Sequence, residues 1–155
     1  MAFFYDDGGN NAPYADANGA LTDVITLCPS TPSGQVIKVE FQLFDVAPGD
    51  RLLAFDGANN TAAPIIASSQ GSGVGSSVAD APGGGSLEAS CKNITGCITF
   101  AFLRNGDNVK GAGFRASVTC KGRSGNVLDC SLINTFNGTT GQFLTVADCS
   151  TGNKK

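Results

Sequence analysis

The amino-acid sequence predicts an all-β fold, a two-sheet antiparallel β-sandwich or jelly roll. Apolar and polar residues alternate strictly in three segments, which is the period of a strand with one buried face. No segment shows the 3.6-residue period of an amphipathic helix. The chain has 21 glycines among 155 residues, and they gather with Asn and Pro between the apolar runs, as expected for turns that join short antiparallel strands.

The three alternating segments are 36–44, 97–104 and 113–120. We expect their apolar faces to line the core, and these faces are Ile37, Val39, Phe41 and Leu43; Ile98, Phe100 and Phe102; Phe114, Ala116, Val118 and Cys120. Less regular apolar runs predict weaker strands at 21–28, 51–56, 65–68, 86–91, 127–133 and 142–146. Segments 86–91 and 97–104, with the five residues between them, are interpreted as one β-hairpin.

Composition narrows the class of protein. Charged residues make up 15% of the chain, below the roughly 25% of typical soluble domains, and the net charge is −3. No basic stripe is present, which disfavours nucleic-acid binding. No apolar run approaches the roughly 20 residues of a membrane-spanning helix, which disfavours membrane insertion. One domain core is expected for this length.

The cysteine count predicts three disulfides and a secreted or cell-surface protein. The six cysteines are Cys28, Cys91, Cys97, Cys120, Cys130 and Cys149. A zinc site is disfavoured because the chain has no histidine and no CxxC pair. Of the 15 pairings, we favour a bond across the hairpin between Cys91 and Cys97, a C-terminal loop closed by Cys130 and Cys149, and Cys28 with Cys120.

The residue chemistry argues against an enzyme. Hydrolytic triads need a base, usually histidine, and the chain has none. Ser–Lys or paired-carboxylate chemistry stays formally open, but Asp6/Asp7 and Asp50/Asp56 are paired only along the sequence. Three N-x-T sequons make Asn59, Asn93 and Asn137 candidate glycosylation sites in predicted turns.

Three stretches of the chain resemble a CUB domain over about residues 3–121. Phe41-Gln42-Leu43-Phe44-Asp45-Val46 and Asp50-Arg51-Leu52-Leu53-Ala54-Phe55-Asp56-Gly57 are similar to the centre of that family. Phe100-Ala101-Phe102-Leu103-Arg104-Asn105-Gly106-Asp107 and Gly111-Ala112-Gly113-Phe114 are similar to its late loop and final strand. Phe4-Tyr5-Asp6-Asp7-Gly8-Gly9-Asn10 and Tyr14 are similar to the opening of its bacterial branch.

The resemblance implies a CUB-like sandwich at 1–121 and a calcium ion at one end of it. By that resemblance Asp50, Asn105 and Asp107 are candidate metal ligands, with Tyr14 and, less strongly, Asp45 as candidate contact residues. Two departures weaken the calcium site. The turn 46–49 lacks the glutamate of the calcium-binding members, and Asn105 stands where an aspartate is usual. Residues 122–155 lie outside the resemblance and are expected to add a β-hairpin packed on the same domain.

The sequence thus favours a secreted, non-catalytic recognition or adhesion module that binds an extracellular protein or glycan with calcium support. Two other functions stay open. One is a structural subunit that self-associates into a fibre or surface layer through residues 122–155, and the other is an accessory domain of a secreted hydrolase. Sugar-stacking residues are few, because the chain has no Trp and two tyrosines. The candidates for exposed aromatic residues are Phe3, Phe4, Phe136 and Phe143, and the alternative is that they pack the terminal strands.

Overall fold

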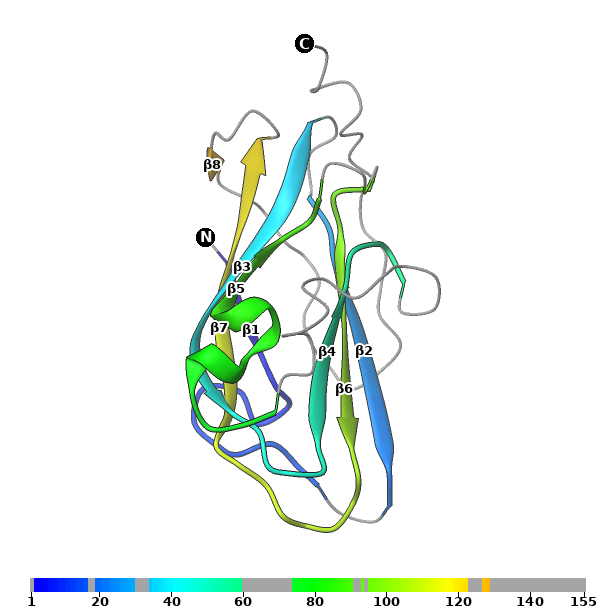
Figure 1. Cartoon of the computed structure of the whole chain (residues 1–155), viewed down its shortest axis with the longest axis vertical. Coiled ribbons are helices and arrows are strands. Elements are labelled where there is room, and N and C mark those ends of the chain that lie inside the picture. Colours follow the sequence, from blue (N-terminus) through cyan, green and yellow to red (C-terminus); the bar gives the residue numbers. More distant parts are fainter. Residues whose placement is uncertain are drawn as a thin grey trace.

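The computed structural model describes residues 2–16, 19–29, 34–59, 74–90, 93, 95–122 and 127–128. Two antiparallel sheets pack face to face (Figure 1), so the predicted all-β sandwich is confirmed. In sheet A the strand order is β1 (Ala2–Tyr5), β7 (Gly113–Gly122), β3 (Gln35–Asp45) and β5 (Ser86–Glu88), with β8 (Val127–Leu128) pairing with β7. In sheet B the order is β2 (Leu21–Leu27), β6 (Ile98–Arg104) and β4 (Arg51–Phe55).

Most of the predicted strands coincide with observed ones. Strands β2, β3, β4, β6 and β7 match the predictions within a few residues at each end, and β5 is shorter than predicted. Strand β1 was not predicted. Two short 3-10 helices, η2 (Val78–Asp80) and η3 (Pro82–Gly85), precede β5. The predicted strands 65–68 and 142–146, the rest of 127–133 and the Cys130–Cys149 pair lie outside the described residues.

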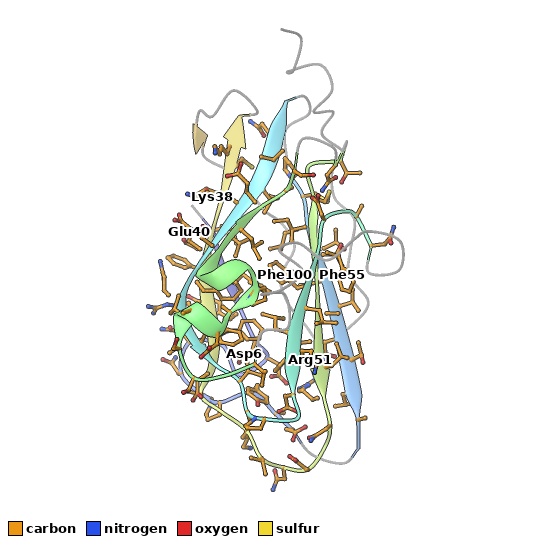
Figure 2. All side chains as sticks on the ribbon, in the orientation of Figure 1. Asp6, Lys38, Glu40, Arg51, Phe55 and Phe100 are labelled. Carbon is orange, nitrogen blue, oxygen red and sulfur yellow. A yellow bond between two sulfur atoms is a disulfide. The ribbon has the colours of Figure 1, made fainter. Side chains whose placement is uncertain are left out.

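Aromatic rings fill the core between the sheets. Phe100 and Phe102 from sheet B meet Phe4 and Phe114 from sheet A, with ring centroids 4.7 Å apart for Phe4–Phe100 and 5.3 Å for Phe102–Phe114. Figure 2 shows Phe100 between the two sheets. Phe4 is 3% exposed, so it is not an exposed aromatic residue and instead packs the terminal strand β1 against the core, the alternative left open for it. Phe3, its neighbour on β1, is 50% exposed as expected.

A β-bulge in β3 corrects one predicted core position. Phe41 pairs with Ala116, but the register shifts so that Leu43 pairs with Arg115. A bulge adds one residue to a strand and therefore reverses the side on which the later side chains point. Leu43 is 43% exposed and faces outward, while Phe44 is buried in its place.

Strands β5 and β6 do not form the predicted hairpin, because β5 pairs with β3 in sheet A and β6 lies in sheet B. Asn93 provides the physical reason. Its Oδ1 accepts the backbone N–H groups of Thr95 and Gly96, both at 3.1 Å, and its Nδ2 donates to the Cys97 carbonyl at 2.6 Å. These bonds hold a compact turn from which the chain enters the second sheet.

A disulfide joins Cys28 to Cys97, with their Cα atoms 4.2 Å apart. The two cysteines directly extend the β2–β6 ladder beyond the pair Leu27–Ile98. Opposed residues in an antiparallel ladder bring their Cα atoms this close without any detour of the backbone. The bond contradicts the predicted pairs Cys91–Cys97 and Cys28–Cys120, although Cys120 is itself disulfide-bonded.

Candidate functional site

Tyr14 joins three segments at one end of the sandwich. Its hydroxyl donates to Asp50 Oδ2 at 2.6 Å and accepts the backbone N–H groups of Ala47 at 3.1 Å and Gly111 at 3.3 Å. The ring is fully buried and stands edge-on to Phe102. We call the region formed by residues 6–16, 46–50 and 105–112 the loop end.

Tyr14 keeps its proton and acts as a donor to Asp50. Burial raises the pKa of Tyr14 above its ordinary value, and the hydrogen bond to the Asp50 carboxylate raises it further. The hydroxyl therefore donates to the Asp50 carboxylate at neutral pH. This bond confirms the expected proximity of Tyr14 to Asp50.

The structure brings together the three predicted ligand positions. Asp50 is 1% exposed, and its Oδ1 accepts the backbone N–H of Asn105 at 2.9 Å. The Asn105 side chain spans the turn to Asp107, with its Nδ2 donating to Asp107 Oδ2 at 2.9 Å and its Oδ1 accepting the Asp107 N–H at 3.1 Å. Hydrogen bonds from the Val109 backbone and from Asn105 hold the pKa of Asp107 below its usual range.

Asp16 is a further residue of this cluster that the sequence did not indicate. It is 1% exposed and accepts the backbone N–H groups of Gly106 at 2.8 Å and Asn108 at 3.0 Å. Its two oxygens thus hold the backbone on both sides of Asp107. The only signal in the sequence is that Asp16 follows Tyr14 by two residues. This spacing does not predict that Asp16 contacts the late loop.

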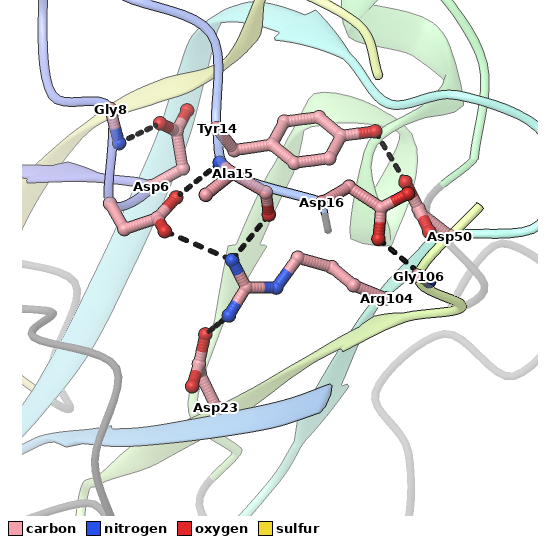
Figure 3. Close-up of polar contacts among 10 residues, drawn as sticks. Asp6, Gly8, Tyr14, Ala15, Asp16, Asp23, Asp50, Arg104 and Gly106 are labelled. Atoms are coloured by element: carbon pink, nitrogen blue, oxygen red, sulfur yellow. Dashed lines mark hydrogen bonds and ion pairs between the residues drawn. The ribbon is translucent and has the colours of Figure 1, made fainter. Parts of the chain in front are cut away.

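Arg104, the last residue of β6, forms a second polar cluster next to the loop end (Figure 3). Its Nη1 lies 2.9 Å from Asp7 Oδ2 and 2.6 Å from the Ala15 carbonyl, and its Nη2 forms an ion pair with Asp23. The side chain of Arg104 is 4% exposed. Burial raises the pKa of Asp23, while the charge of Arg104 opposes that rise.

Asp6 and Asp45 position the backbone rather than facing the cluster of Asp50 and Asp107. Asp6 accepts the N–H groups of Gly8 at 2.7 Å and Phe114 at 2.6 Å, and burial raises its pKa. Asp45 accepts the N–H of Ala112 at 2.7 Å. Both carboxylates thereby fix where the late loop enters β7.

We expect Tyr14→Phe to lower the free energy of unfolding by about 2 kcal/mol, because it leaves the buried Ala47 N–H and Asp50 Oδ2 without their partner. The matched control is Tyr5→Phe, which removes a partly exposed hydroxyl on β1 and is expected to change stability little. Urea unfolding of the three proteins measures the effect. Equal losses for the two variants would contradict the organising role of Tyr14.

The charge of the cluster fits a cation. Within the described ranges, no lysine or arginine forms an ion pair with Asp16, Asp50 or Asp107, and two of these carboxylates are buried. Calcium takes carboxylate, amide and carbonyl oxygens, which are the groups present here. A carboxylate that accepts two hydrogen bonds keeps lone pairs for a metal.

The donor set is nevertheless sparse in carboxylates. Among the described residues, no three His, Cys, Asp or Glu side chains lie at metal-binding spacing. The turn 46–49 adds no carboxylate, and Gly49 packs so closely on Asn105 that a Cβ at Gly49 would lie 2.3 Å from its Nδ2. Calcium would therefore be held by Asp50 and Asp107, with neutral oxygens such as that of Asn105 completing the shell.

The sequon asparagines differ in what the structure shows. Asn93 is 7% exposed, and its Nδ2, the atom that glycosylation modifies, donates to both Cys97 and Asp56. Asn93 therefore acts as a turn organiser in the folded chain. Asn59 is exposed. Asn137 lies outside the described residues.

No family model matches the chain, and no curated protein matches it in sequence. Among the described residues, no helix is long and apolar enough to cross a membrane.

Proposed function

We propose that the chain is a secreted, CUB-like recognition module that binds an extracellular protein or glycan at its loop end with the support of a calcium ion. The observation that carries the proposal is the hydrogen-bonded chain from Tyr14 through Asp50 to Asn105, at 2.6 and 2.9 Å. It fixes three loops on a rigid sandwich, the arrangement in which binding residues are usually presented.

Electrostatics supports the calcium part of the proposal. Asp16 and Asp50 are buried against the backbone of the loop that carries Asp107, and burying carboxylates is unfavourable unless their negative charge is compensated. Hydrogen bonds from backbone N–H groups compensate it in part, and a divalent cation would complete the compensation. The disulfide between Cys28 and Cys97 supports secretion, because such bonds persist in oxidising compartments.

The same contacts support a non-catalytic role. The sequence has no histidine, and Asp6, whose pKa is raised, uses its two oxygens on the backbone of Gly8 and Phe114. A general acid or base must reach a substrate proton. Val109, 54% exposed beside Asp107, instead offers an apolar contact at the rim of the loop end.

Calcium is expected to stabilise the protein. At about 100 times its dissociation constant it should add about 2.7 kcal/mol, which corresponds to about 5–10 °C in Tm for a chain of this size. The measurement is thermal unfolding of the oxidised protein in calcium, in magnesium and in chelator. Magnesium should act more weakly, because it demands near-octahedral geometry that two carboxylates and neutral oxygens do not supply.

Three variants test where the ion binds. Asp107→Asn should abolish the calcium-dependent shift, and Asn105→Asp should increase it by adding a carboxylate beside Asp107. Glu88→Gln removes an exposed carboxylate of sheet A and should leave the shift unchanged. Identical melting curves in calcium and chelator for both the native chain and Asn105→Asp would contradict the calcium site.

A further inference from the structure

The outer face of sheet A carries two aromatic rings. On β1 the buried Phe4 alternates with Phe3 and Tyr5, so these two side chains point away from the core. Phe3 is 50% exposed, and its ring centroid lies 6.2 Å from that of Tyr5. Figure 2 shows Lys38 and Glu40 on the side of this sheet that faces away from sheet B.

The bulge in β3 adds an aliphatic side chain to that face. It turns Leu43 outward opposite Arg115, and Arg115 is also paired with Tyr5 on the other side of β7. The three side chains therefore form one row across β1, β7 and β3. The next row along the strands is formed by Phe3, Ser117 and Glu40. We call Phe3, Tyr5, Leu43, Arg115 and Glu40 the aromatic face.

The two charges of the aromatic face are complementary to each other. Arg115 donates from Nη1 to the neutral Asn10 at 3.3 Å, and its Nε is buried without a partner in the part of the chain that the structure describes. No carboxylate of that part forms an ion pair with it. The side chain of Glu40 is 51% exposed and contacts Lys38 at 3.3 Å. The guanidinium of the half-buried Arg115 therefore has no carboxylate partner among the described residues, and the exposed Glu40 carboxylate can take a second cationic partner from outside.

We propose that two copies of this chain pack their aromatic faces together with two-fold symmetry, so that Arg115 of each copy meets Glu40 of the other. A two-fold interface uses the same patch on both copies and must be self-complementary. The two residues lie in adjacent rows on neighbouring strands. A two-fold axis that lies in the interface midway between them therefore exchanges their positions.

The apolar residues fit the same axis. In the register of the sheet, Leu43 and Phe3 lie on either side of the line from Arg115 to Glu40, and the axis runs past both. Leu43 and Phe3 of one chain then pack against the same residues of the second chain and are removed from water. Aromatic residues and arginine are the types enriched in such interface cores. Because the patch is small, a weak, concentration-dependent dimer is expected.

The test is sedimentation equilibrium of the full oxidised chain over a concentration series. The native chain should shift from the mass of one chain to that of two as concentration rises. Arg115→Glu alone and Glu40→Arg alone should both stay monomeric, because each homodimer would hold two like-charge contacts. An equimolar mixture of the two variants should dimerise, since both contacts in the mixed pair are again attractive.

Two controls keep this test specific. Lys110→Glu makes the same change of charge at the loop end, away from the aromatic face, and should dimerise like the native chain. Leu43→Ser should weaken the dimer but leave the fold intact, because Leu43 is exposed. Thermal unfolding verifies that every variant is folded. A native chain that stays monomeric, association that Arg115→Glu does not change, or a mixture of folded variants that fails to dimerise would overturn the proposal.

Discussion

Replacing both Cys28 and Cys97 by alanine is expected to lower the free energy of unfolding by about 4 kcal/mol, from the loop-closure entropy of the unfolded chain. The bond links positions 69 residues apart in the sequence, so its removal releases a long loop in the unfolded state. Stability losses of this size exceed those of most single substitutions. The double variant avoids leaving one reactive thiol behind.

The measurement is guanidinium unfolding of the oxidised native chain and of the Cys28→Ala/Cys97→Ala variant, without reductant so that the bond of Cys120 stays intact. A serine pair at the same positions is the matched comparison. It should lose more than the alanine pair, because both cysteines are fully buried and a buried hydroxyl needs a partner. A loss below about 1 kcal/mol for the alanine pair would show that the unfolded chain is not constrained by this bond.

Strict alternation predicted the fold class because it records which side of each strand is buried. It failed at Leu43, since a bulge reverses the sides without any local signal in the sequence. It also failed for the hairpin, because alternation does not say which strand is the neighbour. That choice depends on the hydrogen bonds of Asn93, which direct the chain to the other sheet.

The candidate site was predictable where its residues lie in stretches that resemble a family, as with Tyr14, Asp50, Asn105 and Asp107. Asp16 lies outside the stretches on which the resemblance rests, and Arg104 lies in one of them but was assigned no role. The partners of Asp16, Gly106 and Asn108, are 90 and 92 residues away, and Asp7 is 97 residues from Arg104. Contacts at this separation depend on where the fold places the segment 6–16, which no local pattern contains.

Arg104→Met is expected to lower the free energy of unfolding at neutral pH by about 3–5 kcal/mol, because it leaves the buried carboxylate of Asp23 without its counter-charge. Methionine keeps much of the apolar contact of the arginine stem, so the loss reports mainly on charge. Arg51→Met, at an exposed position of β4, is the matched control and should change stability little. Chemical unfolding at a series of pH values measures both variants.

The pH dependence separates lost charge from lost packing. The pKa of Asp23 is already raised by burial, and removing Arg104 raises it further. A carboxyl whose pKa is higher in the folded state destabilises the fold above that pKa, and the penalty disappears as pH falls toward its unfolded value of 3.8. The loss caused by Arg104→Met should therefore shrink between neutral and acid pH. The double variant Arg104→Met/Asp23→Val should regain most of the stability at neutral pH, since apolar replacements of a buried ion pair are often neutral. The alternative is that Arg104 acts through packing. In that case Arg104→Met would lower the free energy of unfolding by the same amount at every pH, and Asp23→Val would not reduce this loss.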